Sequence, residues 1–286
     1  MTAALEPFAA AVTDAVGRAL VEDLTPLGDL TSALLPDDLE ADAAFVARAA
    51  GVLAGQPCAA ETFRQIDPDV AVDWLRRDGD PLEPGTVIAT VQGRLQPILT
   101  AERTALNFLG HLSGIATLTR RYVDAAATTG RARVWDTRKT TPGLRTLEKA
   151  AVRAGGGANH RGNLSDWILL KDNHLALMGI AGAVAAAKDR WPARTVHVEC
   201  DRLDQVEEAL AAGADALLLD NMTPDEVRAC VEAADRVGEK ARRPLLEVSG
   251  GITLDTIASY AGTGVDTISV GAITNSAPVL DIGLDI

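Results

Sequence analysis

The chain has 286 residues, of which 47% are hydrophobic, enough for one large domain or two ordinary ones with buried cores. Its 40 acidic and 27 basic residues give a net charge of −13, which argues against nucleic acid and anionic membranes as partners. No stretch approaches the ~18 uninterrupted apolar residues of a membrane span, and the N-terminus does not resemble a signal or transit peptide. The predicted location is therefore the cytoplasm. Cys58, Cys200 and Cys230 form no disulfide or zinc pattern, and we expect three buried structural thiols.

The first 110 or so residues mix helical and strand patterns. The sequence predicts a helix near 3–21, a strand over 41–55, a helix after Pro57, and strands at 70–77 and 86–95. This order is typical of an α+β domain with a mostly antiparallel sheet.

Residues 98–127 predict one long helix with an apolar stripe. Arg103 and His111 lie two turns apart on its polar stripe, where His111 is more simply a satisfied structural histidine than a ligand. Gly110 and Gly114 are spaced to let another helix pack closely against this one.

From residue 132 onward, short apolar strands alternate with helical patterns, which indicates βαβ units and a parallel sheet, either open or an incomplete barrel. The six predicted strands are 132–137, 167–171, 195–200, 216–220, 245–249 and 267–271. In β/α barrels the carboxyl ends of the strands face one mouth, so the residues that follow them are expected to converge. At these ends stand Thr137, Arg138, Lys139, Lys171, Asn173, His174, Glu199, Asp220, Ser249, Gly250, Gly251, Gly271 and Ala272.

These residue types favour a site for an anionic ligand with hydroxyl groups. Glycines after the last two strands are typical of a phosphate site, although each could also be a simple turn. Lys171 could contact a ligand, pair with Glu199 or Asp220 across the barrel, or form a Schiff base as in class I aldolases. The two acids could hold hydroxyl groups, or Mg²⁺ through its waters. His197 is most simply a satisfied core histidine. The glycine-rich stretch 155–157 is predicted to be a loop that carries His160 and Arg161 to the site.

Nine segments then match one family in order along nearly the whole chain. They are GDLTS (28–32), TAERTALNFLGHLSGIAT (100–117), DTRKTTPGLR (136–145), GGGANHR (155–161), LKDNH (170–174), VECD (198–201), LLLDN (217–221), SGGI (249–252) and SVGAIT (269–274). The chain resembles the quinolinate phosphoribosyltransferases, which convert quinolinate and phosphoribosyl pyrophosphate to nicotinate mononucleotide, CO2 and pyrophosphate in de novo NAD biosynthesis. The resemblance implies an N-terminal α/β sandwich domain at 1–112, an incomplete six-stranded β/α barrel at 113–274, and a tail at 275–286 that packs back on the N-terminal domain.

The resemblance also implies a role for each strand-end residue and a homodimer with shared active sites; a higher oligomer is left open. Arg103 is expected to complete the quinolinate pocket from the partner subunit, and the catalytic group is Lys139, Lys171, Glu199 and Asp220. Mg²⁺ is the implied cofactor, held with phosphoribosyl pyrophosphate by the two acids through water. The quinolinate residues are Arg103, Thr137, Arg138, His160, Arg161 and Lys171. The phosphoribosyl pyrophosphate residues are Lys139, Asn173, His174, Glu199, Asp220, Ser249, Gly250, Gly251, Gly271 and Ala272.

One departure and three alternatives stand beside this interpretation. Gly162 and Asn163 follow the HR pair, where the family usually has a large apolar residue. This departure puts the stiffness of the loop in question but removes no charged group. The nearest alternative is a homologue on the same scaffold of the kind encoded beside molybdate transport genes, ranked lower because the KDNH stretch at 171–174 is intact. The others are the Schiff-base aldolase and a non-catalytic anion-binding module, although binding alone would not require both Glu199 and Asp220.

Overall fold

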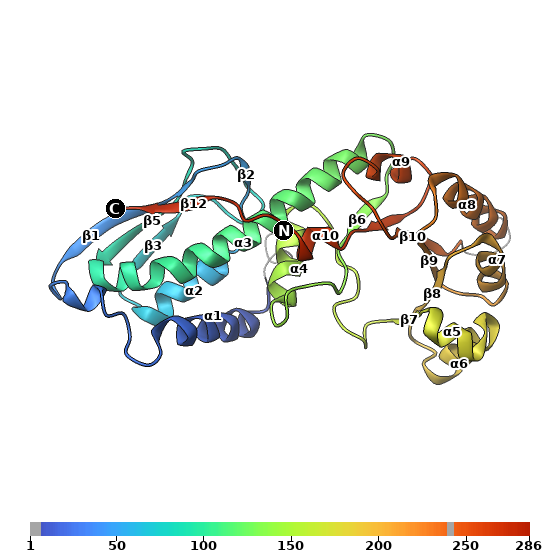
Figure 1. Cartoon of the computed structure of the whole chain (residues 1–286), viewed down its shortest axis with the longest axis horizontal. Coiled ribbons are helices and arrows are strands. Elements are labelled where there is room, and N and C mark those ends of the chain that lie inside the picture. The colour runs from blue at the N-terminus through green and yellow to red at the C-terminus, as the bar shows by residue number, and fades with distance from the viewer. Residues whose placement is uncertain (1–6, 239–242) are drawn as a thin grey trace. The chain divides into compact units, whose positions relative to one another are not determined.

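The computed structural model of the protein describes residues 7–238 and 243–286, and the chain divides into two compact units. The first comprises Met1–Arg120, Lys139–Gly156 and Ala272–Ile286, and the second comprises Arg121–Arg138 and Gly157–Gly271. Their elements are coloured along the chain in Figure 1. This division differs from the predicted domain boundaries because the segment Lys139–Gly156 groups with the N-terminal residues. The boundaries at 112 and 274 stay a prediction.

The first unit is built on an antiparallel sheet of four strands in the order β12-β1-β5-β3. The predicted strand at 41–55 is two strands, β1 and β2, and residues 3–6 of the predicted first helix lie outside the described residues. The elements are α1 (Ala9–Leu24), the 3-10 turn η2 (Ser32–Leu34), β1 (Glu40–Ala47), β2 (Gly51–Val52), α2 (Gln56–Ile66), β3 (Ala71–Trp74), β4 (Pro81–Leu82), β5 (Val87–Arg94), α3 (Leu95–Ala127), α4 (Arg145–Ala154), α10 (Ala272–Asn275) and β12 (Ile282–Asp285). The long predicted helix is confirmed as α3, whose last turns belong to the second unit.

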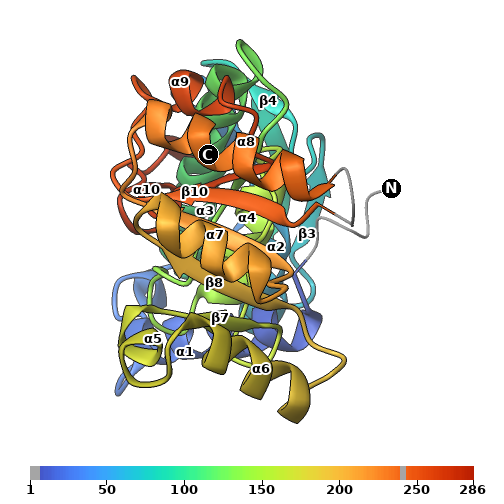
Figure 2. The same ribbon diagram turned by 90° about the vertical axis from the view of Figure 1, so that its right-hand side faces the viewer.

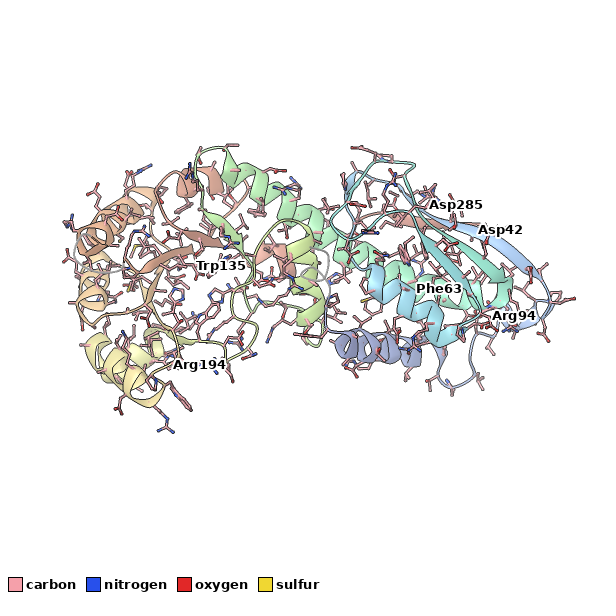
Figure 3. The ribbon with its side chains drawn as sticks, turned by 180° about the vertical axis from the view of Figure 1, so that it is seen from behind. Asp42, Phe63, Arg94, Trp135, Arg194 and Asp285 are labelled. Carbon is pink, nitrogen blue, oxygen red and sulfur yellow. The ribbon has the colours of Figure 1, made fainter. Side chains whose placement is uncertain are left out.

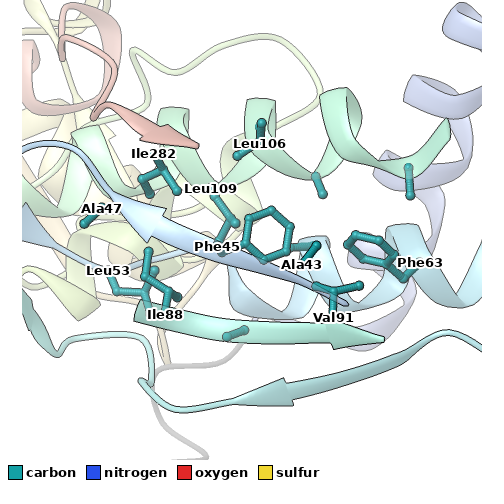
Figure 4. Packing of buried hydrophobic residues seen from close by; sticks show 14 of the residues in the cluster. Ala43, Phe45, Ala47, Leu53, Phe63, Ile88, Val91, Leu106, Leu109 and Ile282 are labelled. Carbon is teal, nitrogen blue, oxygen red and sulfur yellow. The ribbon is translucent and has the colours of Figure 1, made fainter. Parts of the chain in front are cut away.

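An aromatic cluster forms the centre of the first unit's core (Figure 4). The ring of Phe45 on β1 meets Phe63 on α2 edge to face at 5.9 Å and stacks on Trp74 at 6.3 Å. Leu106 and Leu109 of α3 pack against the same cluster. Because the alternate side chains of β1 face inward, burial of these large rings fixes both its register and the position of α3.

The glycine pair of α3 packs against an extended segment of the chain and not against another helix. A Cβ on Gly110 would lie 2.8 Å from Val279, and one on Gly114 would lie 2.1 Å from the carbonyl oxygen of Pro278. The amide of Leu280 donates to the carbonyl of Gly110 at 3.0 Å. The C-terminal segment thus crosses α3 at its glycines before β12 pairs with β1.

We expect Gly114→Ala to destabilise the first unit by about 2 kcal/mol or more, because its methyl group would overlap a backbone carbonyl and not a side chain that can turn away. For a chain of this size that loss lowers Tm by roughly 5 °C, which a thermal melt followed by circular dichroism would detect. Gly182→Ala is the matched control, since nothing lies within 4 Å of that helical position. A Gly114→Ala variant as stable as the control would contradict the proposed close contact.

The second unit is an open parallel sheet in the order β6-β11-β10-β9-β8-β7, which confirms the predicted incomplete six-stranded barrel. Its strands are β6 (Arg133–Trp135), β7 (Ile168–Leu170), β8 (Val196–Cys200), β9 (Ala216–Asp220), β10 (Leu245–Ser249) and β11 (Thr267–Ser269). Its helices are α5 (Asp172–Met178), α6 (Ile180–Arg190), α7 (Leu203–Ala211), α8 (Pro224–Gly238) and α9 (Ile257–Ala261). In Figure 2, α6, α7 and α8 cover the face of the sheet turned to the viewer. Among the described residues, no helix combines the length and apolar character needed to cross a membrane.

Candidate active site

The carboxyl ends of the six parallel strands gather the predicted polar residues at one edge of the sheet. Lys171 follows β7, and Glu199 lies near the end of the neighbouring strand β8. On the next two strands, Asp220 and Ser249 are register partners. This order follows from the parallel topology, since every strand runs in the same direction before its helix returns.

A loop beside β6 positions the basic residues. Ala158 bridges to Trp135 as a parallel strand would, so the loop extends the sheet at its open edge. The carboxylate of the fully buried Asp136 accepts the amide of His160 at 2.9 Å and the side-chain amide of Asn159 at 2.6 Å. These bonds fix the loop just before Arg161, whose guanidinium donates to the carbonyl of Trp167 at 3.5 Å.

Two arginines of the second unit repel each other electrostatically. Arg161 is only 7% exposed. Burial lowers the pKa of Arg161, and the nearby positive charge of Arg138 lowers it further. Like charges held together in a partly buried site favour the binding of an anion, which would relieve their repulsion. The two arginines that the sequence predicts to bind carboxylates thus influence each other electrostatically, and their binding role stays a prediction.

The ion pair considered for Lys171 is present, because its Nζ contacts the carboxylate of Glu199. The next residues form α5, and Nδ1 of His174 accepts the amide of Lys171 at 3.1 Å, which caps that helix. Asn173 lies exposed in its first turn. His174 therefore has a structural role that is compatible with a second contact through its other ring nitrogen.

An acidic cavity of about 410 Å³ lies beside this ion pair. Five carboxylates line it, and Arg202 is the basic residue in its wall; the acids are Asp172, Glu199, Asp201, Glu208 and Asp220. Carboxylate oxygens and water are the ligands that Mg²⁺ prefers. The donor set therefore fits a hydrated Mg²⁺ ion held by Glu199 and Asp220.

The turn after β10 depends on its glycines. Gly250 has φ +93°, and a Cβ there would lie 2.2 Å from the side-chain oxygen of Asn221. The next residue, Gly251, also has a positive φ of +61°, with nothing within 4 Å of its Cβ position. The first glycine lets the ends of β9 and β10 approach, and the second leaves the backbone open to a ligand such as phosphate.

The interior of the incomplete barrel holds a cluster of ionisable side chains that the sequence did not identify. Glu247 of β10 is fully buried, and its Oε2 lies 3.3 Å from Nε2 of His160 and 3.6 Å from Nε2 of His197. Burial alone would raise the pKa of Glu247, but the neighbouring imidazoles of His160 and His197 lower it. The alternation of side chains along β10 could have pointed to Glu247, since it places residue 247 on the same side of the strand as the predicted site residue Ser249. The ring of His160 thus faces the interior.

Three further predicted site residues lie in the first unit. Arg103 is exposed on α3. Lys139 is also exposed, and its carbonyl accepts the hydroxyl of Thr274 at 2.8 Å. Ala272 begins α10. Thr137 and Gly271, which belong to the second unit, directly precede Arg138 and Ala272 in the chain and are partly buried.

The cysteines are buried, as predicted. Burial raises the pKa of the Cys200 thiol to about 12 and that of Cys58 to about 12, and it raises the pKa of Cys230 to about 11. None of them is a thiolate at neutral pH. The position of Cys200 beside Glu199 therefore gives it no nucleophilic role.

Comparison with known proteins identifies the family. Residues 29–113 match the quinolinate phosphoribosyl transferase N-terminal domain, and residues 115–285 match the C-terminal domain of the same family. The nicotinate-nucleotide pyrophosphorylase (carboxylating) of Mycobacterium leprae is 43% identical, covering 96% of this chain and 97% of the relative. A probable enzyme of the same name from Bacillus subtilis is 42% identical over 91% of this chain and 88% of its own. The solved nicotinate-nucleotide pyrophosphorylase of Francisella tularensis superposes with a TM-score of 0.93 at 39% identity, covering 98% and 97% of the two chains. The chain therefore belongs to the quinolinate phosphoribosyl transferase family.

Proposed function

We propose that the protein transfers the phosphoribosyl group of phosphoribosyl pyrophosphate to quinolinate and releases CO2 and pyrophosphate, which gives nicotinate mononucleotide for NAD biosynthesis. The observation that carries this proposal is the pairing of two functional halves at one edge of the sheet. Arg138 and Arg161 form a cationic half, and an acidic cavity with Glu199 and Asp220 forms the other. A pyridine dicarboxylate suits the first half, and a ribose with a metal-bound pyrophosphate suits the second.

Quinolinate would bind through its two carboxylates. The guanidinium groups of Arg138 and Arg161 suit bidentate capture, and their mutual repulsion is relieved when a dianion lies between them. Lys171 would complete the clamp from β7, with Thr137 beside it. His160 would act through the loop, because its ring faces Glu247 while its backbone precedes Arg161.

Phosphoribosyl pyrophosphate would lie along the acidic half of the site. Glu199 and Asp220 would hold the ribose hydroxyls and, through water, a Mg²⁺ ion that neutralises charge on the departing pyrophosphate. Lys139, Asn173 and His174 are proposed to contact the pyrophosphate. The 5′-phosphate would bind at the turns after the last two strands, at Ser249, Gly250, Gly251, Gly271 and Ala272.

The chemistry then requires two steps, transfer of the phosphoribosyl group to the ring nitrogen and replacement of the C2 carboxylate by a proton. The pyridine nitrogen attacks the anomeric carbon as the bond to pyrophosphate breaks, and the two carboxylates stabilise the positive charge that grows there. The resulting pyridinium accepts the electron pair left when the adjacent C2 carboxylate departs as CO2, and C2 then takes up a proton. The residues that hold the ring also exclude water from that carboxylate, which favours its loss.

The test is a steady-state assay with quinolinate, phosphoribosyl pyrophosphate and Mg²⁺, followed by the loss of quinolinate absorbance and by chromatography of nicotinate mononucleotide. Nicotinate in place of quinolinate is the control substrate. We expect turnover with quinolinate and none with nicotinate. Binding of quinolinate without turnover would contradict the proposal and favour a homologue with another substrate or a non-catalytic module.

We further propose a homodimer in which Arg103 of one subunit completes the quinolinate pocket of the other. The exposed position of this arginine on α3 supports a role outside its own subunit. A higher oligomer and a cytoplasmic location stay predictions of the sequence.

Mixed dimers test the shared site. Arg103→Ala and Arg138→Ala, each inactive alone, are expected to recover about one quarter of wild-type activity when unfolded and refolded together in equal amounts, because half of the dimers then hold one intact site. Refolded wild type serves as the reference. Arg138→Ala mixed with Lys139→Ala is the control. If Arg103 is the residue that comes from the partner, Arg138 and Lys139 belong to the same pocket, so every site in these mixed dimers lacks one of them and no activity returns. Equal recovery in both mixtures, or none in either, would exclude this arrangement.

A further inference from the structure

A buried cluster of two histidines and one glutamate lies inside the second unit, below the strand ends. His160 comes from the loop beside β6, His197 from β8 and Glu247 from β10, and the three are 7%, 2% and 0% exposed. One coordinating atom from each lies within 4.8 Å of the others. Three segments far apart in the sequence therefore present nitrogen and oxygen donors to one small volume.

The spacing of these atoms fits a metal site. The Oε2 atom of Glu247 lies 3.3 Å from Nε2 of His160 and 3.6 Å from Nε2 of His197. In a tetrahedral zinc site with bonds of about 2.0–2.1 Å, neighbouring ligand atoms lie about 3.3–3.4 Å apart. These two separations are close to that edge length, and the two imidazole nitrogens lie within 4.8 Å of each other, so the histidines would move together to bind an ion.

The surroundings also resemble those of metal ligands. The backbone of Leu217 lies near the imidazole of His197, and Nε2 of that ring lies 3.6 Å from Oε2 of Glu247. Ser269 of β11 is a polar neighbour of Glu247. Two imidazoles and one carboxylate select Zn²⁺ and similar transition metals, whereas Mg²⁺ prefers oxygen donors alone.

A cavity approaches the cluster on the side away from the strand carboxyl ends, and His197 is the cluster residue that lines it. This cavity of about 930 Å³ lies at the amino ends of β8, β9 and β10, where it is lined by Thr195, Ala216 and Leu245 and reaches His197, Trp135 and Trp167. Trp135 and Arg194, two of its lining residues, are labelled in Figure 3. An ion entering here would not pass through the acidic cavity that holds Glu199 and Asp220.

We propose that His160, His197 and Glu247 bind one divalent transition-metal ion, with Zn²⁺ as the favoured ion and water as the fourth ligand. The ion connects β8 and β10 with the loop that carries Arg161, so it stabilises the arginine pair from below. Its role is structural, and it is distinct from a Mg²⁺ ion bound with phosphoribosyl pyrophosphate.

Cobalt substitution tests the site without any substrate. Full-length protein stripped with a strong chelator is titrated with Co²⁺ and then with Zn²⁺. We expect one equivalent of Co²⁺ to give the visible absorption bands of a tetrahedral ion, and Zn²⁺ to displace it with a dissociation constant below about 1 µM. Glu247→Gln and His197→Gln should lose the bands, whereas Asp220→Asn and His111→Gln should retain them, because those residues lie outside the cluster.

X-ray absorption of the zinc-loaded wild type keeps the test decisive if a cluster variant fails to fold. Two imidazole ligands and oxygen donors are the expected coordination shell. Substoichiometric binding, an all-oxygen shell, or cobalt bands that survive both cluster variants would overturn the proposal. Because no step uses quinolinate, failure here leaves the proposed transferase activity untouched, and the converse also holds.

Discussion

Arg138→Ala is expected to lower kcat/KM for quinolinate by about 100- to 1000-fold, which corresponds to about 3–4 kcal/mol of lost transition-state binding. The proposed contact is a bidentate pair between a partly buried guanidinium and a substrate carboxylate. Its neighbour Arg161 is strained by the same charge, since Arg138 lowers the pKa of Arg161. Removal of Arg138 relieves this repulsion, and a thermal melt followed by circular dichroism shows whether the variant keeps its fold.

Two further variants sharpen this experiment. Arg138→Lys keeps the charge but not the planar pair of donors, so it should recover only part of the activity. Arg131→Ala removes an exposed arginine from the same segment and should leave kcat/KM within about 3-fold of the wild type. An Arg138→Ala enzyme with that same near-normal kcat/KM would show that the arginine pair does not bind the substrate.

Asp220→Asn is expected to reduce kcat by about 100- to 1000-fold while quinolinate affinity changes little. The substitution preserves shape, so the pairing of residue 220 with Ser249 and the bond from Asn221 can persist. It removes one of the two carboxylates proposed to hold the ribose and the hydrated Mg²⁺ ion. The Mg²⁺ concentration needed for half-maximal activity should therefore rise.

The measurements for this variant are steady-state kinetics against Mg²⁺ concentration and calorimetric titration with quinolinate. Glu207→Gln, an exposed acid on α7 that does not line the acidic cavity, is the control for the loss of one negative charge. The proposed role of Asp220 would be untenable if the two variants had the same kcat and the same Mg²⁺ dependence.

The sequence predicted the parallel sheet and the residues at its edge because both depend on local patterns. Apolar runs that end in Lys171, Glu199 or Asp220 identify strands and their carboxyl ends without knowledge of distant contacts. Parallel topology then brings these ends together in any such fold. The ion pair between Lys171 and Glu199 was among the alternatives for the same reason.

Contacts between residues far apart in the chain could not be predicted from the sequence. The spacing of Gly110 and Gly114 indicates a close approach, but it does not say that an extended C-terminal segment supplies it. His111 pairs with the buried Glu148 at 2.9 Å, a contact across 37 residues that helps group the segment Lys139–Gly156 with the first unit. Glu247 lies within an apolar strand, and it becomes a candidate metal ligand only because its carboxylate lies near the imidazoles of His160 and His197.

The most direct test of the central claim is the fate of the C2 carboxylate of quinolinate. Quinolinate with a labelled C2 carboxylate carbon is incubated with the protein, phosphoribosyl pyrophosphate and Mg²⁺. Labelled CO2, total pyrophosphate and total nicotinate mononucleotide are then each quantified in the same reaction. The account predicts equal amounts of the three products, with no CO2 when phosphoribosyl pyrophosphate is omitted. Release of CO2 without the sugar donor, or a nucleotide that retains the label, would contradict it.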